Sequence, residues 1–243
     1  MTTPFSPSQT ALSPAQVVVF DFDHTLYNGD SLSQLLRWLI GRHVWRCILA
    51  LLATPLLAPL IYLLKTRQTA IRIYIWIATV RWRSVFHFQQ AVDQFVSAKQ
   101  EHLRGRLLTQ GLKCLSAHRQ AGDRVVIATG APVALARALI ALAGISDVTI
   151  LGTEIQFRQW SLCTLRHCHH HQKLAMLVEA GFYPITTAYS DSLADLPLLL
   201  AARQPVVVNP KGTQIRAWKQ LVPQATVVNW GCPRRGGQRP GAD

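Results

Sequence analysis

The sequence predicts an α/β fold, in which a doubly wound parallel sheet carries an all-α insertion after its first strand. Two observations predict it. Short β-branched runs alternate with stretches whose apolar residues recur at helical spacing, and strands of this kind that are apolar throughout are typical of parallel sheets covered on both faces. A length of 243 residues fits one such domain with an insertion.

The elements follow from these patterns in chain order. We expect buried strands at residues 17–21, 124–129, 148–151, 186–190 and 205–209. We expect helices at residues 103–119, 132–143, 172–180 and 193–202, where apolar residues follow the helical period and glycine follows several of them. Residues 153–164 alternate apolar and polar positions, which predicts an antiparallel hairpin added to the sheet.

Composition divides the chain into four parts. Residues 1–15 are rich in proline and serine and are expected to be a disordered leader, and residues 226–243, which end in a Gly/Pro/Arg-rich stretch, a flexible tail. Residues 16–30 and 103–225 form the expected catalytic core, and residues 31–102 the helical insertion. The five cysteines show no CxxC spacing, which favours a reducing compartment over a disulfide framework.

The insertion contains an apolar segment. Residues 47–64 are eighteen consecutive residues without charge between Arg46 and Lys65, close to the minimum length of a membrane span. Because Pro55 and Pro59 interrupt the run, a crossing, a re-entrant and an interfacial segment all remain open.

Charge points to an anionic partner. The formal net charge is +13, and no acidic residue occurs from Ser31 to Val92. Basic side chains beside an apolar run favour an anionic phospholipid surface, and we predict that the insertion associates with a membrane. A cap whose apolar helix faces pack against one another is the alternative. Nucleic acid would explain the charge but not the apolar run, so we expect no nucleic-acid partner.

Paired carboxylates follow the first strand. Asp21 and Asp23 lie two residues apart at its carboxyl end, the edge at which parallel sheets bind ligands. Carboxylates this close repel each other unless a cation lies between them, and Mg²⁺ suits oxygen ligands and a phosphate. One aspartate can then act as a nucleophile and the other as an acid and base. An acidic pair that only caps a helix is the alternative for the motif alone.

Three later segments carry matching signals. Thr129 and Gly130 end the second strand, where a hydroxyl and backbone N–H groups at a helix start can hold a phosphate. Lys173 begins a helix and can neutralise the phosphate and the nucleophile. Asp191 and Asp195 follow a fourth strand as a second carboxylate pair.

These motifs resemble those of the HAD (haloacid dehalogenase-like) phosphohydrolases from residue 17 to about residue 211. The resemblance implies Asp21 as nucleophile and Mg²⁺ ligand, and Asp23 as general acid and base and as ligand through its backbone carbonyl. It further implies phosphate binding by the Thr129 segment. The roles it implies for the remaining motif residues are charge stabilisation by Lys173, Mg²⁺ binding by Asp191, and support of that site by Asp195. His24 replaces the glycine often found inside the first motif, a change expected to affect how tightly the loop turns.

The place of the insertion resembles the phosphoserine-phosphatase-like branch of that family, and its apolar run resembles the phosphatidylglycerophosphatase C subfamily. The resemblance implies dephosphorylation of phosphatidylglycerophosphate to phosphatidylglycerol through an aspartyl-phosphate, at a bacterial inner membrane with the catalytic domain on the cytoplasmic side. The alternatives are a phosphatase for a small soluble ester such as phosphoserine, and a non-catalytic scaffold. The histidines between His167 and His171 are expected to be loop residues rather than a zinc site. The oligomeric state stays open.

Overall fold

A computed structural model describes residues 15–62, 67–80, 82, 84–158 and 161–231. Within these residues seven strands form one sheet in the order β4-β3-β2-β1-β5-β6-β7. The strands are β1 (Val17–Phe20), β2 (Arg124–Pro132), β3 (Thr149–Arg158), β4 (Ser161–Arg166), β5 (Ile185–Ser190), β6 (Ala202–Val208) and β7 (Thr226–Val228). Every pairing is parallel except β3 with β4, which form the antiparallel hairpin that the sequence predicts.

Helices cover both faces of the sheet, as the predicted doubly wound fold requires. Side chains of β1 alternate between two cores, with Val18 and Phe20 in one and Val17 and Val19 in the other. Helices α5 (Thr109–Gln120) and α6 (Val133–Ala141) contribute to the first core. Helices α7 (His171–Glu179), α8 (Leu196–Ala201) and α9 (Ile215–Leu221) contribute to the second.

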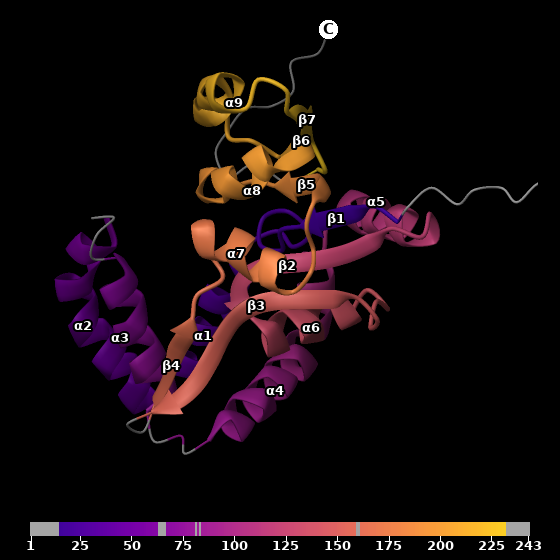
Figure 1. Cartoon of the computed structure of the whole chain (residues 1–243). Coiled ribbons are helices and arrows are strands. Elements are labelled where there is room, and N and C mark those ends of the chain that lie inside the picture. Colours follow the sequence, from indigo (N-terminus) through magenta and orange to yellow (C-terminus); the bar gives the residue numbers. More distant parts are fainter. Residues whose placement is uncertain (1–14, 63–66, 81, 83, 159–160, 232–243) are drawn as a thin grey trace, which may run out of the picture.

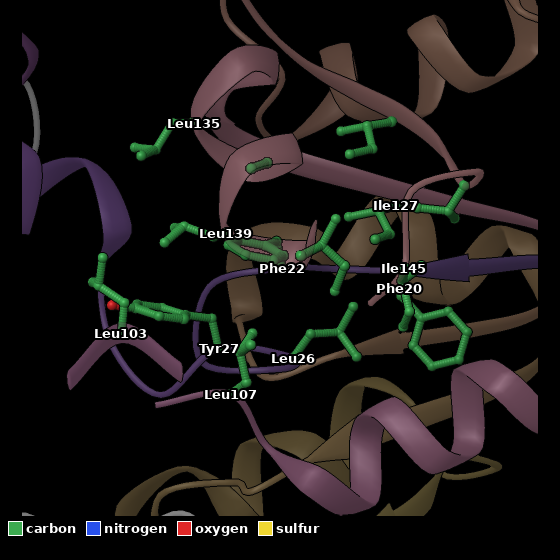
Figure 2. Close-up of a cluster of buried hydrophobic side chains, with 14 of the residues drawn as sticks. Phe20, Phe22, Leu26, Tyr27, Leu103, Leu107, Ile127, Leu135, Leu139 and Ile145 are labelled. Carbon is green, nitrogen blue, oxygen red and sulfur yellow. The ribbon is translucent and has the colours of Figure 1, made fainter. Parts of the chain in front are cut away.

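The insertion is helical, with α1 (Ser31–Gly41), α2 (Val44–Tyr62), α3 (Arg67–Thr79) and α4 (Val85–Arg104). Figure 1 shows α2 and α3 side by side at one end of the molecule, with α3 close to β4. Side chains of α1 and α4 belong to the first core, which joins the insertion firmly to the sheet. Figure 2 shows the centre of that core, where Phe22 and Tyr27 of the loop after β1 lie near Leu103 of α4 and Leu139 of α6.

Several boundaries differ from the expected ones. The helix expected over residues 103–119 is divided, because α4 ends at Arg104 and α5 begins at Thr109, with Gly105 between them. Strand β3 runs past residue 151 and continues into the hairpin, so one long strand serves both the parallel sheet and the antiparallel pair. Strand β7 lies where we expected the flexible tail to begin; the expected leader up to residue 14 and the tail from residue 232 lie outside the described residues.

The expected inner-membrane location is wrong. In the described parts of the chain no helix is long and apolar enough to cross a membrane. Residues 47–62 of the apolar run lie in α2, the rest of the run is outside the described residues, and α3 packs along α2. The hydroxyls of Thr54 in α2 and Tyr74 in α3 lie 2.9 Å apart, which places a polar contact within the hairpin.

Candidate active site

The predicted site lies at the carboxyl ends of β1 and of its two neighbours in the sheet, β2 and β5. Asp21 directly follows β1, and its backbone N–H donates to the carbonyl of Tyr189 in β5 at 2.9 Å. Strand β2 ends on the other side of β1, and Asp191 directly follows β5. Because these strands are parallel, their carboxyl ends meet at one edge, where such folds bind ligands.

A buried lysine joins two of the predicted aspartates. The Lys173 Nζ donates to Asp21 Oδ1 at 2.8 Å and to Asp195 Oδ2 at 2.6 Å. The Ser190 hydroxyl donates to the same Asp195 oxygen at 2.8 Å. All four side chains are buried. This buried cluster contains two carboxyl groups and one ammonium group. When both carboxyl groups are ionised, its net charge is −1.

The charges of this cluster shift the pKa values of Asp21 and Lys173. Burial raises the pKa of Asp21 to about 6, and the Asp195 carboxylate adds to this effect while Lys173 opposes it. Burial alone would lower the pKa of Lys173, but the charges of Asp195 and Asp21 outweigh burial and hold that pKa well above its usual value. Lys173 therefore stays protonated and keeps Asp21 available as an anion near neutral pH.

Asp23 occupies a different environment, at the start of the insertion. Its Oδ1 accepts a hydrogen bond from the Ser31 backbone N–H of α1 at 3.0 Å. Burial, with the charge of Asp30 second, raises the pKa of Asp23 to about 7. Asp30 itself caps α1 by accepting from the Ser33 N–H at 2.7 Å. A carboxyl group with a pKa near 7 suits proton transfer in both directions.

The loop between the two aspartates and α1 turns tightly. His24 has a φ of 61°, in the left-handed region that favours glycine. Its backbone N–H donates to the Tyr27 carbonyl at 2.6 Å, which closes the turn. A histidine in the place where the family often has glycine therefore adopts the glycine-like conformation rather than widening the loop.

The expected phosphate segment lies at the end of β2. The buried Thr129 hydroxyl accepts from the Ala131 N–H at 3.0 Å and fixes the backbone of the turn before α6. The Gly130 carbonyl accepts from the Thr153 hydroxyl of β3 at 2.6 Å, and that hydroxyl also contacts His167 Nδ1 at 2.8 Å. Sequence reasoning did not identify Thr153, because a threonine inside an alternating strand carries no distinguishing pattern. His167 was expected only to be a loop residue.

Asp191 completes the group of carboxylates. Burial, followed by the charge of Asp21 and then that of Asp195, raises the pKa of Asp191 to about 8. Among the described residues no three His, Cys, Asp and Glu side chains form a ready metal site. The donor set nevertheless fits Mg²⁺, because the buried carboxylate of Asp21 and the half-buried one of Asp191 repel each other and favour a cation. Mg²⁺ takes few protein ligands and completes its shell with water and phosphate.

Comparison with known proteins decides the family. The model of the haloacid dehalogenase-like hydrolases matches residues 18–200, which include every predicted site residue. The chain belongs to the haloacid dehalogenase-like hydrolase family.

Solved structures share the fold of this hydrolase. A protein of unknown function from Bordetella pertussis Tohama I is 22% identical, with a TM-score of 0.71, over 90% of this chain and 100% of that one. A phosphoserine phosphohydrolase-like protein from Francisella tularensis is 16% identical, with a TM-score of 0.55, over 88% and 94%. A phosphoserine phosphatase described as a phospho-aspartyl intermediate analogue is 11% identical, with a TM-score of 0.50, over 88% and 93%. These likenesses show that the chain shares its fold with phosphoserine phosphatase-like proteins.

Proposed function

We propose that this hydrolase is a Mg²⁺-dependent phosphatase of phosphomonoesters that works through an aspartyl-phosphate. The observation that carries the proposal is the position of Asp21, which is held at the end of β1 by the Lys173 ammonium at 2.8 Å. An ionised carboxylate in a buried site at neutral pH has the charge state of a nucleophile. The family match supports hydrolysis, and the name of one structural neighbour refers to a phospho-aspartyl intermediate.

The residues of the site divide the reaction between them. An Asp21 oxygen forms a bond to phosphorus while the ester P–O bond breaks, and Asp23 donates its proton to the departing alkoxide. In the second step Asp23 accepts a proton from water, the water oxygen bonds to phosphorus, and the Asp21–phosphorus bond breaks. The Thr129–Gly130 segment holds the phosphate, and Lys173 balances the charge of the nucleophile.

Mg²⁺ would be held by the carboxylates of Asp21 and Asp191 and by the backbone carbonyl of Asp23, with Asp195 supporting the site through Lys173 and Ser190. When bound, the ion supplies positive charge that offsets the negative charge of the phosphate and of the carboxylates.

The substrate class that the comparisons favour is a small soluble phosphomonoester of the kind to which phosphoserine belongs. Two of the structural neighbours carry phosphoserine phosphatase or phosphohydrolase in their names. The insertion also lies where a cap would cover a small ester, because the N-terminus of α1 contacts Asp23 directly.

A second candidate substrate is phosphatidylglycerophosphate, an anionic phospholipid that would yield phosphatidylglycerol. One observation favours it. Helix α2 exposes a row of large apolar side chains, with Val44, Leu51 and Leu56 each more than 70% exposed. Monomeric soluble domains seldom expose a patch of this kind without a partner. No acidic residue accompanies these side chains between Ser31 and Val92, so an anionic lipid would meet no repelling charge on α1, α2 or α3.

Phosphate release by the purified protein tests the proposal. The assay compares phosphoserine with phosphatidylglycerophosphate in mixed micelles, each with and without Mg²⁺. We expect Mg²⁺-dependent release from at least one ester, abolished in Asp21→Asn and retained in Asp93→Asn, which neutralises an exposed aspartate of α4. Turnover by Asp21→Asn at the wild-type rate would overturn the mechanism.

A further inference from the structure

A network of hydrogen bonds joins the phosphate segment at the end of β2 to the loop that precedes α7. The buried Thr153 hydroxyl of β3 donates to the Gly130 carbonyl at 2.6 Å. The same oxygen accepts from the Cys168 backbone N–H at 3.2 Å and lies 2.8 Å from His167 Nδ1. Both of these residues belong to the loop between β4 and α7, the helix that carries Lys173 (Figure 1). The proposed mechanism gives no role to Thr153 or His167, although both adjoin the segment that holds the phosphate.

The number of protons in this network fixes the direction of each bond. A hydroxyl has one proton to donate and a carbonyl oxygen can only accept, so the Thr153 proton points to Gly130. Were that proton directed to His167, the two oxygen atoms 2.6 Å apart would have no proton between them. The backbone N–H of Cys168 can only donate. The contact with His167 Nδ1 therefore has the imidazole as donor, and Nδ1 carries a proton.

The protonation state of His167 narrows this arrangement to one tautomer. Partial burial, followed by the positive charge of Lys173, lowers the pKa of His167 below its ordinary value, so the imidazole is neutral at pH 7. A neutral imidazole has one N–H, and with that proton on Nδ1 the Nε2 atom is unprotonated. The opposite tautomer would present a bare Nδ1 to Thr153, which would compete with the Gly130 carbonyl for the one hydroxyl proton.

Side chains hold both ends of the peptide unit between Gly130 and Ala131. Thr153 holds the Gly130 carbonyl, and the Ala131 N–H donates to the Thr129 hydroxyl at 3.0 Å. The His167 ring also lies next to Gly130, because its Cε1 is 3.8 Å from the position that a Cβ on Gly130 would occupy. A peptide unit fixed in this way keeps the turn before α6 in one orientation, so little conformational freedom is lost when a phosphate binds there.

We infer that His167 is a positioning residue of the phosphate site. Its Nδ1–H directs the Thr153 hydroxyl to the Gly130 carbonyl, and this bond holds the phosphate segment in the shape that binds a phosphate. The inference rests on the phosphate site of the proposed function, and it adds a residue that acts through Thr153 rather than on the reacting atoms. Because the segment holds the phosphate and not the alcohol, the contribution of His167 should be the same for every phosphomonoester and for inorganic phosphate.

Two replacements of His167 separate the effect of its N–H from that of its ring. His167→Asn keeps an N–H donor attached to Cγ, where Nδ1 lies, whereas His167→Phe keeps a ring and has no donor. We would measure the dissociation constant of inorganic phosphate by titration calorimetry with Mg²⁺, and kcat and KM for p-nitrophenyl phosphate. His167→Phe should raise the dissociation constant and KM about 2–12-fold, the range of one hydrogen bond, and leave kcat nearly unchanged. His167→Asn should remain near wild type.

A double variant tests whether His167 acts through Thr153. Thr153→Val removes the hydroxyl and keeps the shape of the side chain, so adding His167→Phe to it should weaken phosphate binding no further. The control His87→Phe replaces an exposed histidine of α4 and should leave all constants unchanged. A folding defect alone would lower the number of binding sites per chain and not their affinity. Wild-type affinity in His167→Phe, equal losses in His167→Phe and His167→Asn, or additive losses in the double variant would each overturn the inference.

The tautomer of His167 is measured separately. In ¹⁵N-labelled protein at pH 8, its imidazole signals, assigned by their loss in His167→Asn, should show a protonated Nδ1 and an unprotonated Nε2. The opposite pattern would overturn the inference. Phosphate binding and the tautomer are both measured without turnover. A chain that binds phosphate but releases none from any ester would therefore overturn the proposed function and leave this inference standing, whereas a wild-type chain that binds no phosphate would overturn both.

Discussion

Replacing Lys173 by methionine should reduce both stability and activity, and the structure gives the size of each effect. The ammonium contacts Asp21 at 2.8 Å and Asp195 at 2.6 Å, and all three side chains are buried. Removing one partner from a buried ion pair typically costs about 3–5 kcal/mol, because a charge is left without compensation. For a chain of this length each kcal/mol lowers the unfolding temperature by about 2–4 °C, so Lys173→Met should unfold roughly 6–20 °C lower at pH 8.

The loss should depend on pH with a definite sign. Lys173 opposes the rise in the pKa of Asp21, so without the ammonium the folded-state pKa of Asp21 rises further above its unfolded value, and protons bind the folded variant more tightly than the unfolded one. The stability of the variant therefore increases as the pH falls, and the difference from wild type should be smaller at pH 5 than at pH 8. Phosphate release should fall roughly 10²–10³-fold, as when one charge-stabilising donor is removed.

Calorimetric unfolding at pH 5 and pH 8, together with phosphate release, checks these values. Lys113→Met is the matched control, because Lys113 is exposed on α5 and should change neither quantity. An unfolding temperature of Lys173→Met within 2 °C of wild type at pH 8, or a difference that grows toward pH 5, would refute the charge-balance reasoning.

Three further predictions follow from other contacts. Asp23→Asn should slow phosphate release roughly 10²–10⁴-fold without lowering the unfolding temperature, since it removes a proton donor and keeps its shape; wild-type rates of release would contradict its role. Gly152→Ala should lower the free energy of unfolding, measured with denaturant, by about 1–3 kcal/mol, because its new Cβ would lie 2.7 Å from a backbone oxygen of β2. The control is Gly41→Ala, whose new Cβ meets no atom within 4 Å. Equal stabilities of the two variants would refute the close approach. Burial raises the pKa of Cys114, but hydrogen bonds with His118 and Tyr189 outweigh burial and lower that pKa below its usual value. His118→Leu should therefore slow alkylation of this cysteine by iodoacetamide at pH 7. An unchanged rate would exclude His118 as the cause of the lowered pKa.

The sequence could predict the sheet and the edge at which the site lies, because both follow from local patterns. The β-branched run just before Asp21 identifies this segment as a strand from its own residues. In a parallel sheet its carboxyl end then lies next to the carboxyl end of β2. The hairpin after residue 152 follows from strict alternation in the same way. These features depend on neighbours in the chain, and one sequence contains that information.

Some contacts between distant residues could not be predicted. The motifs indicate that Lys173 neutralises the nucleophile, but nothing in the sequence indicates that it also binds Asp195, or that Thr153 supports the Gly130 carbonyl, because these pairs depend on how α7 and β3 dock on the sheet. The inner-membrane location was wrong for a related reason. An uncharged run has the composition of a membrane segment, but composition does not show what the helix packs against, and in this fold α3 packs along α2.

The most direct test of the aspartyl-phosphate mechanism is to capture the phosphoryl group on the protein. The wild-type chain is mixed with a ³²P-labelled phosphomonoester and Mg²⁺, quenched in acid within milliseconds, and the protein-bound label is located by borohydride reduction and peptide mass analysis. We expect an acid-stable label on Asp21 that is absent from Asp21→Asn and present in Asp93→Asn. Phosphate release by the wild-type chain with no label on Asp21, or with the label on another residue, would contradict it.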